Sequence, residues 1–206
     1  MSRERTIGIL MFDNAEELDF VGPYEVFTMS NEMFARSENR RPDKVLLISE
    51  GGKTTTCAKG MRVEAMAATA DIRKLDVLLV PGGMGTRTEV NNEALKGWIA
   101  GVTKDAEWVT SVCTGAMLLT AAGPARGKRV TTHWAFVEEL RKRGEASEVV
   151  EKLRYVRDGN VVTSAGVSAG IDMALWLVGQ MHGEDHARLT QLGMQYDPAP
   201  PYAAAV

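Results

Sequence analysis

One cysteine of this sequence stands where a nucleophile is expected. Residues 107–112 (EWVTSV) have the composition of a buried strand, Cys113 follows directly, and residues 114–122 have the pattern of a short apolar helix. A strand that turns sharply into a helix is the arrangement of a nucleophile elbow, and the helix dipole lowers the pKa of a thiol placed at its N-terminus. We therefore predict that Cys113 is strained and partly ionised at neutral pH. The alternative is a structural cysteine, since cysteine is among the most buried residue types.

A carboxylate follows the first expected strand. Asp19 lies between the apolar residues Leu18 and Phe20. One interpretation is a helix N-cap, a common role for aspartate at the start of a helix. The other is a carboxyl group in a cleft, where loss of solvent raises its pKa. Glu16 and Glu17 are neighbouring alternatives that we expect to be solvated.

Glycine-rich turns follow two other expected strands. Gly82 and Gly83 come after residues 75–80, and Gly166 comes after residues 160–164. Free backbone N–H groups in such turns can stabilise developing negative charge, although an ordinary glycine turn would look the same. The spacing lacks the Gly-x-Gly-x-x-Gly pattern of a dinucleotide site.

The three histidines give weaker signals. His133 follows a short apolar segment, where a single histidine is usually structural. His182 and His186 have the i,i+4 spacing of a metal pair, but Gly183 weakens a helix there and no third ligand is evident. We therefore expect a solvated helix end and no metal site.

The elements that would position these residues alternate along the chain. Strand patterns cover residues 6–12, 44–49, 75–80, 107–112 and 160–164; helix patterns cover residues 20–35, 92–104, 114–122, 134–143, 168–182 and 184–195. Pro23 suits the first turn of the first of these helices. Hairpins are expected within residues 54–65 and 154–164, and an extended tail over residues 197–206. This alternation predicts a mostly parallel sheet with helices on both faces and ligands at the carboxyl ends of its strands.

Composition limits the class of protein. The chain has 206 residues, of which 45% are hydrophobic and 25% charged, which is typical of a globular protein and predicts a single domain over residues 1–206. The net charge of −3 leaves no basic stripe for nucleic acid. No apolar run approaches the ~20 residues of a membrane span or the length of a signal peptide core. Two cysteines, Cys57 and Cys113, are expected to be free thiols, and we expect the protein to be cytoplasmic.

With these residues in view, the chain resembles the DJ-1/PfpI superfamily, and within it the isonitrile hydratase group. The resemblance covers nearly the whole chain, and its motifs are LDFVGPYEVF (18–27), VPGG (80–83), VTSVCTG (109–115), TTHW (131–134), GVSAGID (166–172) and QYDPAPP (195–201). Some of these motifs are also similar to the amidase-like domain of certain AraC-family regulators. Those regulators continue into a helix-turn-helix domain, which this sequence lacks, so we expect no DNA-binding role.

The resemblance implies a fold and a set of site residues. The fold is a flavodoxin-like three-layer α/β sandwich, usually a homodimer. By match, Cys113 is the nucleophile, and Asp19 stands where peptidase-like and glyoxalase-like members carry glutamate. Thr114 stands where peptidase-like members carry histidine, which argues against a Cys-His dyad. Gly82, Gly83, His133 and Gly166 are expected to line the substrate pocket, with the Thr114 hydroxyl bonding the substrate nitrogen or a water.

The implied activity is a lyase reaction that hydrates an isonitrile to an N-substituted formamide. Cys113 would add to the isonitrile carbon while Asp19 delivers a proton, and the resulting thioimidate would be hydrolysed. This reaction needs no metal, flavin or nucleotide cofactor. The alternatives are a redox-sensing or stress-response protein with an oxidisable Cys113, or a glyoxalase or deglycase, which the Asp19 and Thr114 substitutions disfavour.

Overall fold

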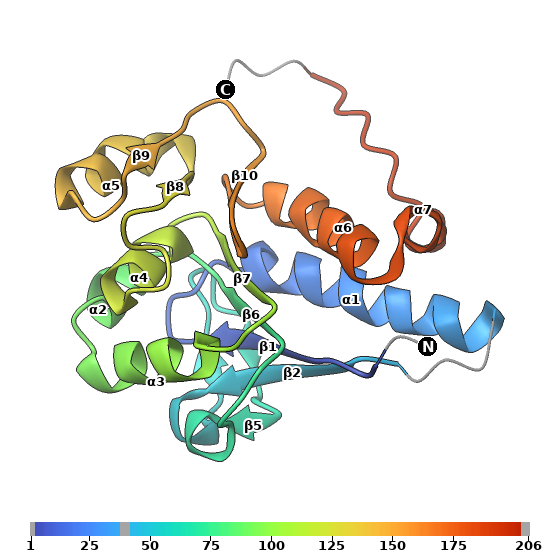
Figure 1. Cartoon of the computed structure of the whole chain (residues 1–206), viewed down its shortest axis with the longest axis horizontal. Helices are drawn as coiled ribbons and strands as arrows, with labels where there is room; N and C mark the ends of the chain where they lie inside the picture. The colour runs from blue at the N-terminus through green and yellow to red at the C-terminus, as the bar shows by residue number, and fades with distance from the viewer. Residues whose placement is uncertain (1–2, 38–41, 203–206) are drawn as a thin grey trace.

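A seven-stranded sheet runs through the centre of the molecule, with its strands in the order β10-β11-β7-β6-β1-β2-β5 (Figure 1). The computed structural model describes residues 3–37 and 42–202. The strands of this sheet are β1 (Thr6–Met11), β2 (Lys44–Ser49), β5 (Ala67–Ala68), β6 (Val77–Val80), β7 (Trp108–Val112), β10 (Tyr155–Asp158) and β11 (Val161–Ser164). All neighbours pair in parallel except β10, which forms an antiparallel hairpin with β11 at the sheet edge. Two small sheets lie outside it: β3 (Thr55–Thr56) with β4 (Arg62–Val63), and β8 (Arg129–Val130) with β9 (Glu148–Val149).

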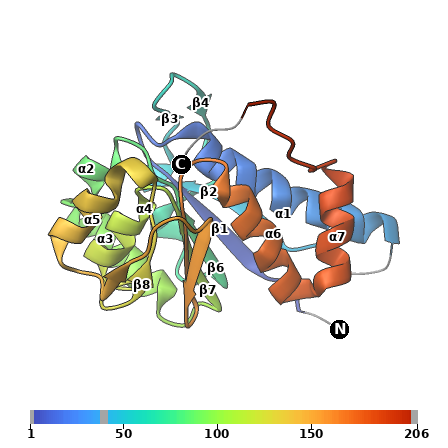
Figure 2. The same cartoon turned by 90° about the horizontal axis from the view of Figure 1, so that it is seen from above.

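Helices cover both faces of the sheet, as Figure 2 shows. One layer consists of α1 (Glu17–Ser37), α6 (Ala169–His182) and α7 (Glu184–Gly193). The other consists of α2 (Thr86–Glu89), α3 (Glu93–Thr103), α4 (Gly115–Ala122) and α5 (Val137–Arg143). Short 3₁₀ helices lie at Glu50–Gly52, Thr69–Asp71 and Trp134–Phe136. The predicted three-layer, flavodoxin-like α/β fold is therefore confirmed, and none of the helices among the described residues is long and apolar enough to cross a membrane.

The buried strands explain why the sequence shows continuous apolar runs. Every residue of β6 has an exposed fraction of 0%, and five of the six residues of β1 are buried. A strand covered by helices on both faces has no solvent side, so hydrophobic residues do not alternate with polar ones. Thr110 of β7 is accommodated in the same core because its hydroxyl donates to the Leu78 carbonyl at 3.0 Å.

Several expected boundaries differ from the structure. The first helix begins at Glu17 rather than at residue 20, so Pro23 lies inside α1 and not in its first turn. The helix expected from residue 134 begins as a 3₁₀ turn and becomes α5 only at Val137. The two-residue edge strand β5 gave no sequence signal. The C-terminal tail contains no helix or strand up to Tyr202, and residues 203–206 lie outside the described part of the chain.

The order of the strands creates one position suited to a ligand. After β1 the chain adds β2 on one side, and it later returns to add β6 on the other side of β1. In open parallel sheets the crevice at such a switch point, beyond the carboxyl ends of the strands, is where ligands bind. The segments that follow β1, β6 and β7 carry Asp19, Gly82 and Cys113 to this crevice.

The contact between α4 and β6 gives a testable prediction. A Cβ on Gly115 would lie 2.2 Å from the Val80 carbonyl oxygen, whereas a Cβ on Gly97 of α3 would meet nothing within 4 Å. We expect Gly115→Ala to lower the free energy of unfolding by about 1–3 kcal/mol or more, because the helix must move off the strand. Gly97→Ala is the matched control and should raise it by about 0.5–1 kcal/mol. Urea unfolding checks both, and a Gly115→Ala variant as stable as the parent protein would contradict the close approach.

Candidate active site

Cys113 occupies the turn between β7 and α4. Its φ is 55°, in the left-handed region that a non-glycine residue enters only at a cost, and its N–H donates to the Ala165 carbonyl at 2.9 Å. The Thr132 hydroxyl donates to the Cys113 carbonyl at 2.8 Å. The strained turn that the sequence predicted is therefore present, and it is fixed by β11 and by the segment after β8.

Asp19 lies inside α1 and points into the protein. Its exposed fraction is 0%, and its Oδ2 accepts a hydrogen bond from the Gly82 N–H at 2.8 Å. Its Oδ1 has no hydrogen-bond partner among the described residues. The N-cap interpretation is therefore wrong, and the interpretation as a carboxyl group in a cleft is supported.

Burial decides the protonation of Asp19. Loss of solvent raises the pKa of this carboxyl to about 8, and the nearby Glu16 carboxylate adds to the rise. The Gly82 N–H, the Lys59 ammonium and the Cys113 thiol lower the pKa, but by less than burial raises it. The Asp19 carboxyl is therefore mostly protonated at neutral pH. Since Oδ2 accepts the Gly82 N–H, the proton belongs on Oδ1.

The Cys113 thiol is also neutral. It is 5% exposed, and burial raises its pKa to about 12, with a further rise from the Asp19 charge when that group is ionised. The N–H and hydroxyl of Thr114 lower the pKa by less. The expectation of a partly ionised thiol is wrong for this state of the protein, because the N-terminus of the short helix α4 does not offset the loss of solvent.

The two turn glycines have different neighbours from those expected. The Gly82 N–H is taken by Asp19, and the Gly83 N–H donates to the Thr114 hydroxyl oxygen at 3.0 Å. Neither N–H is free to stabilise charge on a ligand. Gly82 is required by close approach, since a Cβ there would lie 2.5 Å from the Thr114 nitrogen and 2.8 Å from the Cys113 Cβ.

Thr114 is fully buried, and its hydroxyl forms hydrogen bonds with the Gly82–Gly83 turn. Its hydroxyl accepts from the Gly83 N–H and lies 3.1 Å from the Gly83 carbonyl oxygen and 3.1 Å from the Thr86 hydroxyl. These bonds direct the Thr114 hydroxyl toward the turn. Its backbone N–H lies close enough to the Cys113 sulfur to lower the thiol pKa.

His133 and Gly166 pack against each other beside this centre. A Cβ on Gly166 would lie 2.1 Å from the His133 Cδ2, so only glycine leaves room for the ring. The His133 Nδ1 accepts a hydrogen bond from the Ala135 N–H at 3.2 Å, and burial lowers the pKa of the ring. The imidazole is therefore neutral at pH 7, with its proton on Nε2.

The sequence missed a pair of charges next to this centre. Glu16 and Glu17 were expected to be solvated, but their side chains are only 20% and 17% exposed. The Lys59 ammonium, at the tip of the β3–β4 hairpin, forms ion pairs with both. Glu16 raises the pKa of Asp19, of Cys113 and of His133, and Lys59 lowers the pKa of Asp19.

The other two histidines are buried, which corrects the prediction of a solvated helix end. The His182 side chain is 2% exposed and its Nε2 bonds to Asp43 Oδ2 at 2.7 Å. His186 bonds to the Ser30 hydroxyl at 2.8 Å and stacks on Phe34. They join α6 and α7 to α1 and to the start of β2, far from Cys113. In the described ranges, no three or more His, Cys, Asp or Glu residues are grouped so that they could hold a metal ion.

The protein is an α/β sandwich with a buried cysteine, Cys113, beside a buried aspartic acid, Asp19. Comparison with known proteins identifies the family to which this arrangement belongs. Residues 5–180 match the DJ-1/PfpI family, to which the chain belongs. The chain is 38% identical to an isonitrile hydratase from Pseudomonas putida over 196 residues, covering 95% of this chain and 80% of that enzyme. It is 25% identical to the transcriptional regulator GbdR of Pseudomonas aeruginosa, but there it spans only 48% of the relative.

Solved structures agree with this assignment. A ThiJ/PfpI family protein from Pseudomonas syringae superposes with a TM-score of 0.88 at 29% identity, covering 100% of this chain and 80% of the other. Drosophila melanogaster DJ-1beta superposes with a TM-score of 0.81 at 19% identity, over 95% of this chain and 100% of the other. The second likeness concerns the fold alone.

The raised pKa of Asp19 predicts a specific dependence of stability on pH. The folded protein holds the Asp19 proton up to about pH 8, whereas the unfolded chain releases it near pH 3.8. The contribution of this group to the free energy of unfolding is therefore fully present below pH 3.8 and is lost as the pH rises to about 8. In Asp19→Asn the side chain stays neutral throughout. We expect the unfolding free energy of the parent protein to fall relative to this variant by about 1.4 kcal/mol per pH unit over this interval.

Urea unfolding of both proteins at pH 5, 6.5 and 8.5 measures this difference. The comparison removes the contributions of other titrating groups, because both chains share them. A difference in unfolding free energy that stays constant over this range would show that Asp19 is ionised in the folded protein.

Proposed function

We propose that this protein is an isonitrile hydratase, a lyase that adds water to an isonitrile and releases an N-substituted formamide through a covalent intermediate on Cys113. The observation that carries the proposal is a buried carboxyl with a pKa of about 8 beside a strained thiol. The membership of the chain in the DJ-1/PfpI family and its 38% identity to an isonitrile hydratase support the same reaction.

The first step adds the thiol across the isonitrile carbon. The Cys113 sulfur forms a bond to this carbon, and the proton on Asp19 Oδ1 passes to the same carbon, giving a thioimidate, R–N=CH–S. The proton released by the thiol returns to Asp19, so no net charge remains in the buried site. A neutral thiol and a neutral acid suit this step, because charge develops only while the substrate carbon accepts both groups.

The second step hydrolyses the thioimidate. Asp19 gives its proton to the imine nitrogen and takes a proton from a water as the water oxygen attacks the carbon, so the carboxyl stays neutral. The tetrahedral adduct then collapses: the carbon–sulfur bond breaks, and the hydroxyl proton of the adduct passes through Asp19 to the sulfur. The product is R–NH–CHO, and the balance is one isonitrile and one water consumed per formamide.

The surrounding residues have distinct roles in this proposal. The Thr114 N–H, which faces the sulfur, stabilises negative charge on it during bond formation and breakage. The Thr114 hydroxyl holds the Gly82–Gly83 turn, which in turn holds Asp19. The His133 Nε2–H serves as a neutral donor for the substrate nitrogen or the water, with Gly166 making room for the ring. The reaction draws on no metal, flavin or nucleotide.

The neutral thiol disfavours a redox-sensing role. Sensor cysteines combine a low pKa with access to solvent, whereas Cys113 has a pKa of about 12 and is 5% exposed. A glyoxalase or deglycase role is disfavoured by Asp19 and Thr114, which replace the residues that such relatives carry.

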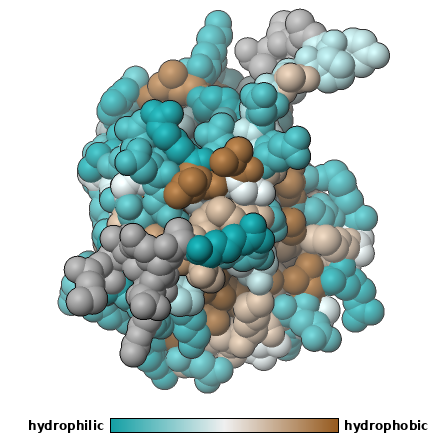
Figure 3. Space-filling model, turned by 90° about the vertical axis from the view of Figure 1, so that its right-hand side faces the viewer, coloured by the Kyte–Doolittle hydropathy of each residue, from teal (hydrophilic) through white to brown (hydrophobic). Residues whose placement is uncertain are grey.

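We also propose that the protein forms a homodimer and acts in the cytoplasm. Large apolar side chains remain exposed on two helices of the same layer, Leu18 and Val21 of α1 and Leu189 and Leu192 of α7. Figure 3 shows a face of the molecule on which apolar residues lie among polar ones. Exposed apolar groups of this kind suit contact with a second copy. Light scattering that gives the mass of one chain at micromolar concentration would contradict the dimer.

Turnover of cyclohexyl isocyanide, followed by the appearance of the formamide, tests the activity. We expect Cys113→Ala to be inactive and Asp19→Asn to lose about 100-fold or more in kcat/KM. Because the protonated form of Asp19 is required, kcat/KM should be flat at lower pH and fall about tenfold per unit as pH rises beyond about 8. Cys57→Ser, which changes the other free cysteine, should retain activity.

The outcomes separate the parts of the proposal. If the parent protein forms no formamide from cyclohexyl isocyanide, the proposed isonitrile hydratase activity is wrong. Near-full activity of Asp19→Asn with an inactive Cys113→Ala would show that the acid is misassigned, and Glu16 or Glu17 would be the next candidate.

A further inference from the structure

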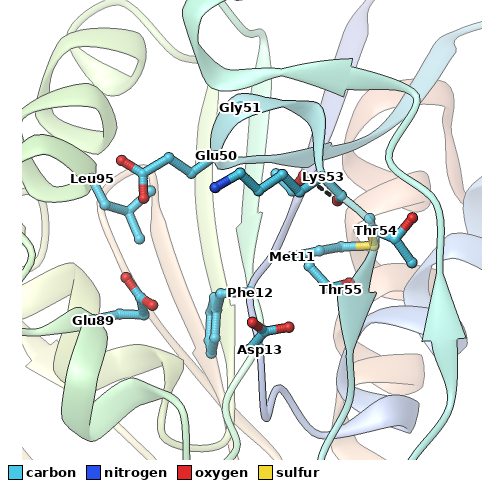
Figure 4. Close-up of a pocket in the computed structure, with 11 residues that line it drawn as sticks. Met11, Phe12, Asp13, Glu50, Gly51, Lys53, Thr54, Thr55, Glu89 and Leu95 are labelled. Atoms are coloured by element: carbon cyan, nitrogen blue, oxygen red, sulfur yellow. Dashed lines mark hydrogen bonds between the residues drawn. The ribbon is translucent and has the colours of Figure 1, made fainter.

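A cavity of about 410 Å³ lies beyond the carboxyl ends of β1 and β2 (Figure 4). Its apolar part is formed by Met11, Phe12 and Leu95. Neither Cys113 nor Asp19 lines it, so it is distinct from the candidate active site. Its size is within the range of about 300–1,000 Å³ that is usual for small-molecule sites.

Two carboxylates are held together on one side of this cavity. The Asn92 side-chain amide donates to Glu50 at 3.1 Å and to Glu89 at 2.9 Å. Both glutamates line the cavity, and Figure 4 shows their carboxylates on the same side of it. Neither forms an ion pair with any residue that the structure describes. Two like charges fixed side by side attract a cation.

A lysine reaches into the same space without a partner. Figure 4 shows the Lys53 side chain extending across the cavity, and within residues 3–37 and 42–202 it forms no ion pair. Thr55 also lines the cavity; it is 5% exposed, and its hydroxyl oxygen has no hydrogen-bond partner in the described chain. A buried polar atom without a partner is uncommon in folded proteins.

We propose that this cavity binds a small zwitterion of amino-acid size. Glu50 and Glu89 take the ammonium group, Lys53 takes the carboxylate, and the apolar part of the ligand packs on Met11 and Phe12. Asp13, whose Oδ1 accepts the Thr56 N–H at 2.8 Å, is a third carboxylate lining the cavity. A simple anion would face three carboxylates, and a simple cation would leave Lys53 unpaired, so the charges favour a ligand that carries both signs.

Isothermal titration calorimetry with glycine, L-leucine and L-phenylalanine tests this proposal. We expect at least one of the three to bind, and to bind about tenfold or more tightly than its two single-charge analogues. For L-leucine these are 3-methylbutylamine, which lacks the carboxylate, and 4-methylpentanoate, which lacks the ammonium group. A gap of this size corresponds to losing about one charged contact.

Variants assign the two charges. Lys53→Met should weaken zwitterion binding about tenfold and leave amine binding unchanged, whereas Glu89→Gln should weaken both. Lys74→Met is the matched control, because Lys74 is exposed and lies outside the cavity. Cys113→Ala should bind the zwitterion as the parent protein does, so this result is independent of isonitrile turnover.

Absence of binding by all three amino acids at 10 mM would overturn the proposal. Equal affinity for a zwitterion and its single-charge analogues would also overturn it, as would Lys53→Met binding the zwitterion like the control.

Discussion

The Asp19 carboxyl is fully buried, and its one hydrogen bond within the described part of the chain comes from the Gly82 N–H at 2.8 Å. This contact joins α1 to the turn after β6, and the same turn packs directly on Cys113. A single amide donor does not replace the solvation that a carboxylate loses on burial, so the group remains protonated at neutral pH. The protonation of the site and the path of the chain around it therefore depend on the same contact.

In the proposed reaction, the neutral Cys113–Asp19 pair allows the nucleophilic cysteine to be buried. An ionised thiol would be reactive toward oxidants and disulfides at all times. In the proposed reaction, the Cys113 thiol keeps its proton until a substrate contacts both the thiol and the Asp19 carboxyl, which exchanges that proton. An isonitrile, whose carbon accepts a proton and a nucleophile in one step, matches a site that holds both groups in neutral form.

The strands are predictable from the sequence. Helices cover both faces of the sheet, so strands such as β2 and β6 are continuous apolar runs. The sequence does not predict contacts made over long separations. The partner of Asp19 is 63 residues away, and that of His182 is 139 residues away. The local sequence therefore leaves the buried carboxyl as one of two alternatives and gives no signal for the buried histidine.

The errors at the site have the same origin. An aspartate near a helix start suggests an N-cap, and Pro23 suggests that the helix begins later than Glu17. The helix dipole at Cys113 suggests a lowered pKa, but the burial that opposes it depends on elements that pack around the turn. The family resemblance assigned Cys113 and Asp19 to one site. Their burial in the structure raises the pKa of both groups, so that both are neutral at pH 7.

Direct titration of the Asp19 carboxyl tests the central claim, that burial keeps this group protonated at neutral pH. The carboxyl ¹³C shift of the folded protein, labelled at aspartate, is followed from about pH 3 to 9, with Asp19→Asn identifying the resonance. The account predicts a midpoint near pH 8. A midpoint close to the ordinary aspartate value of 3.8 would show an ionised carboxylate beside Cys113 and would contradict it.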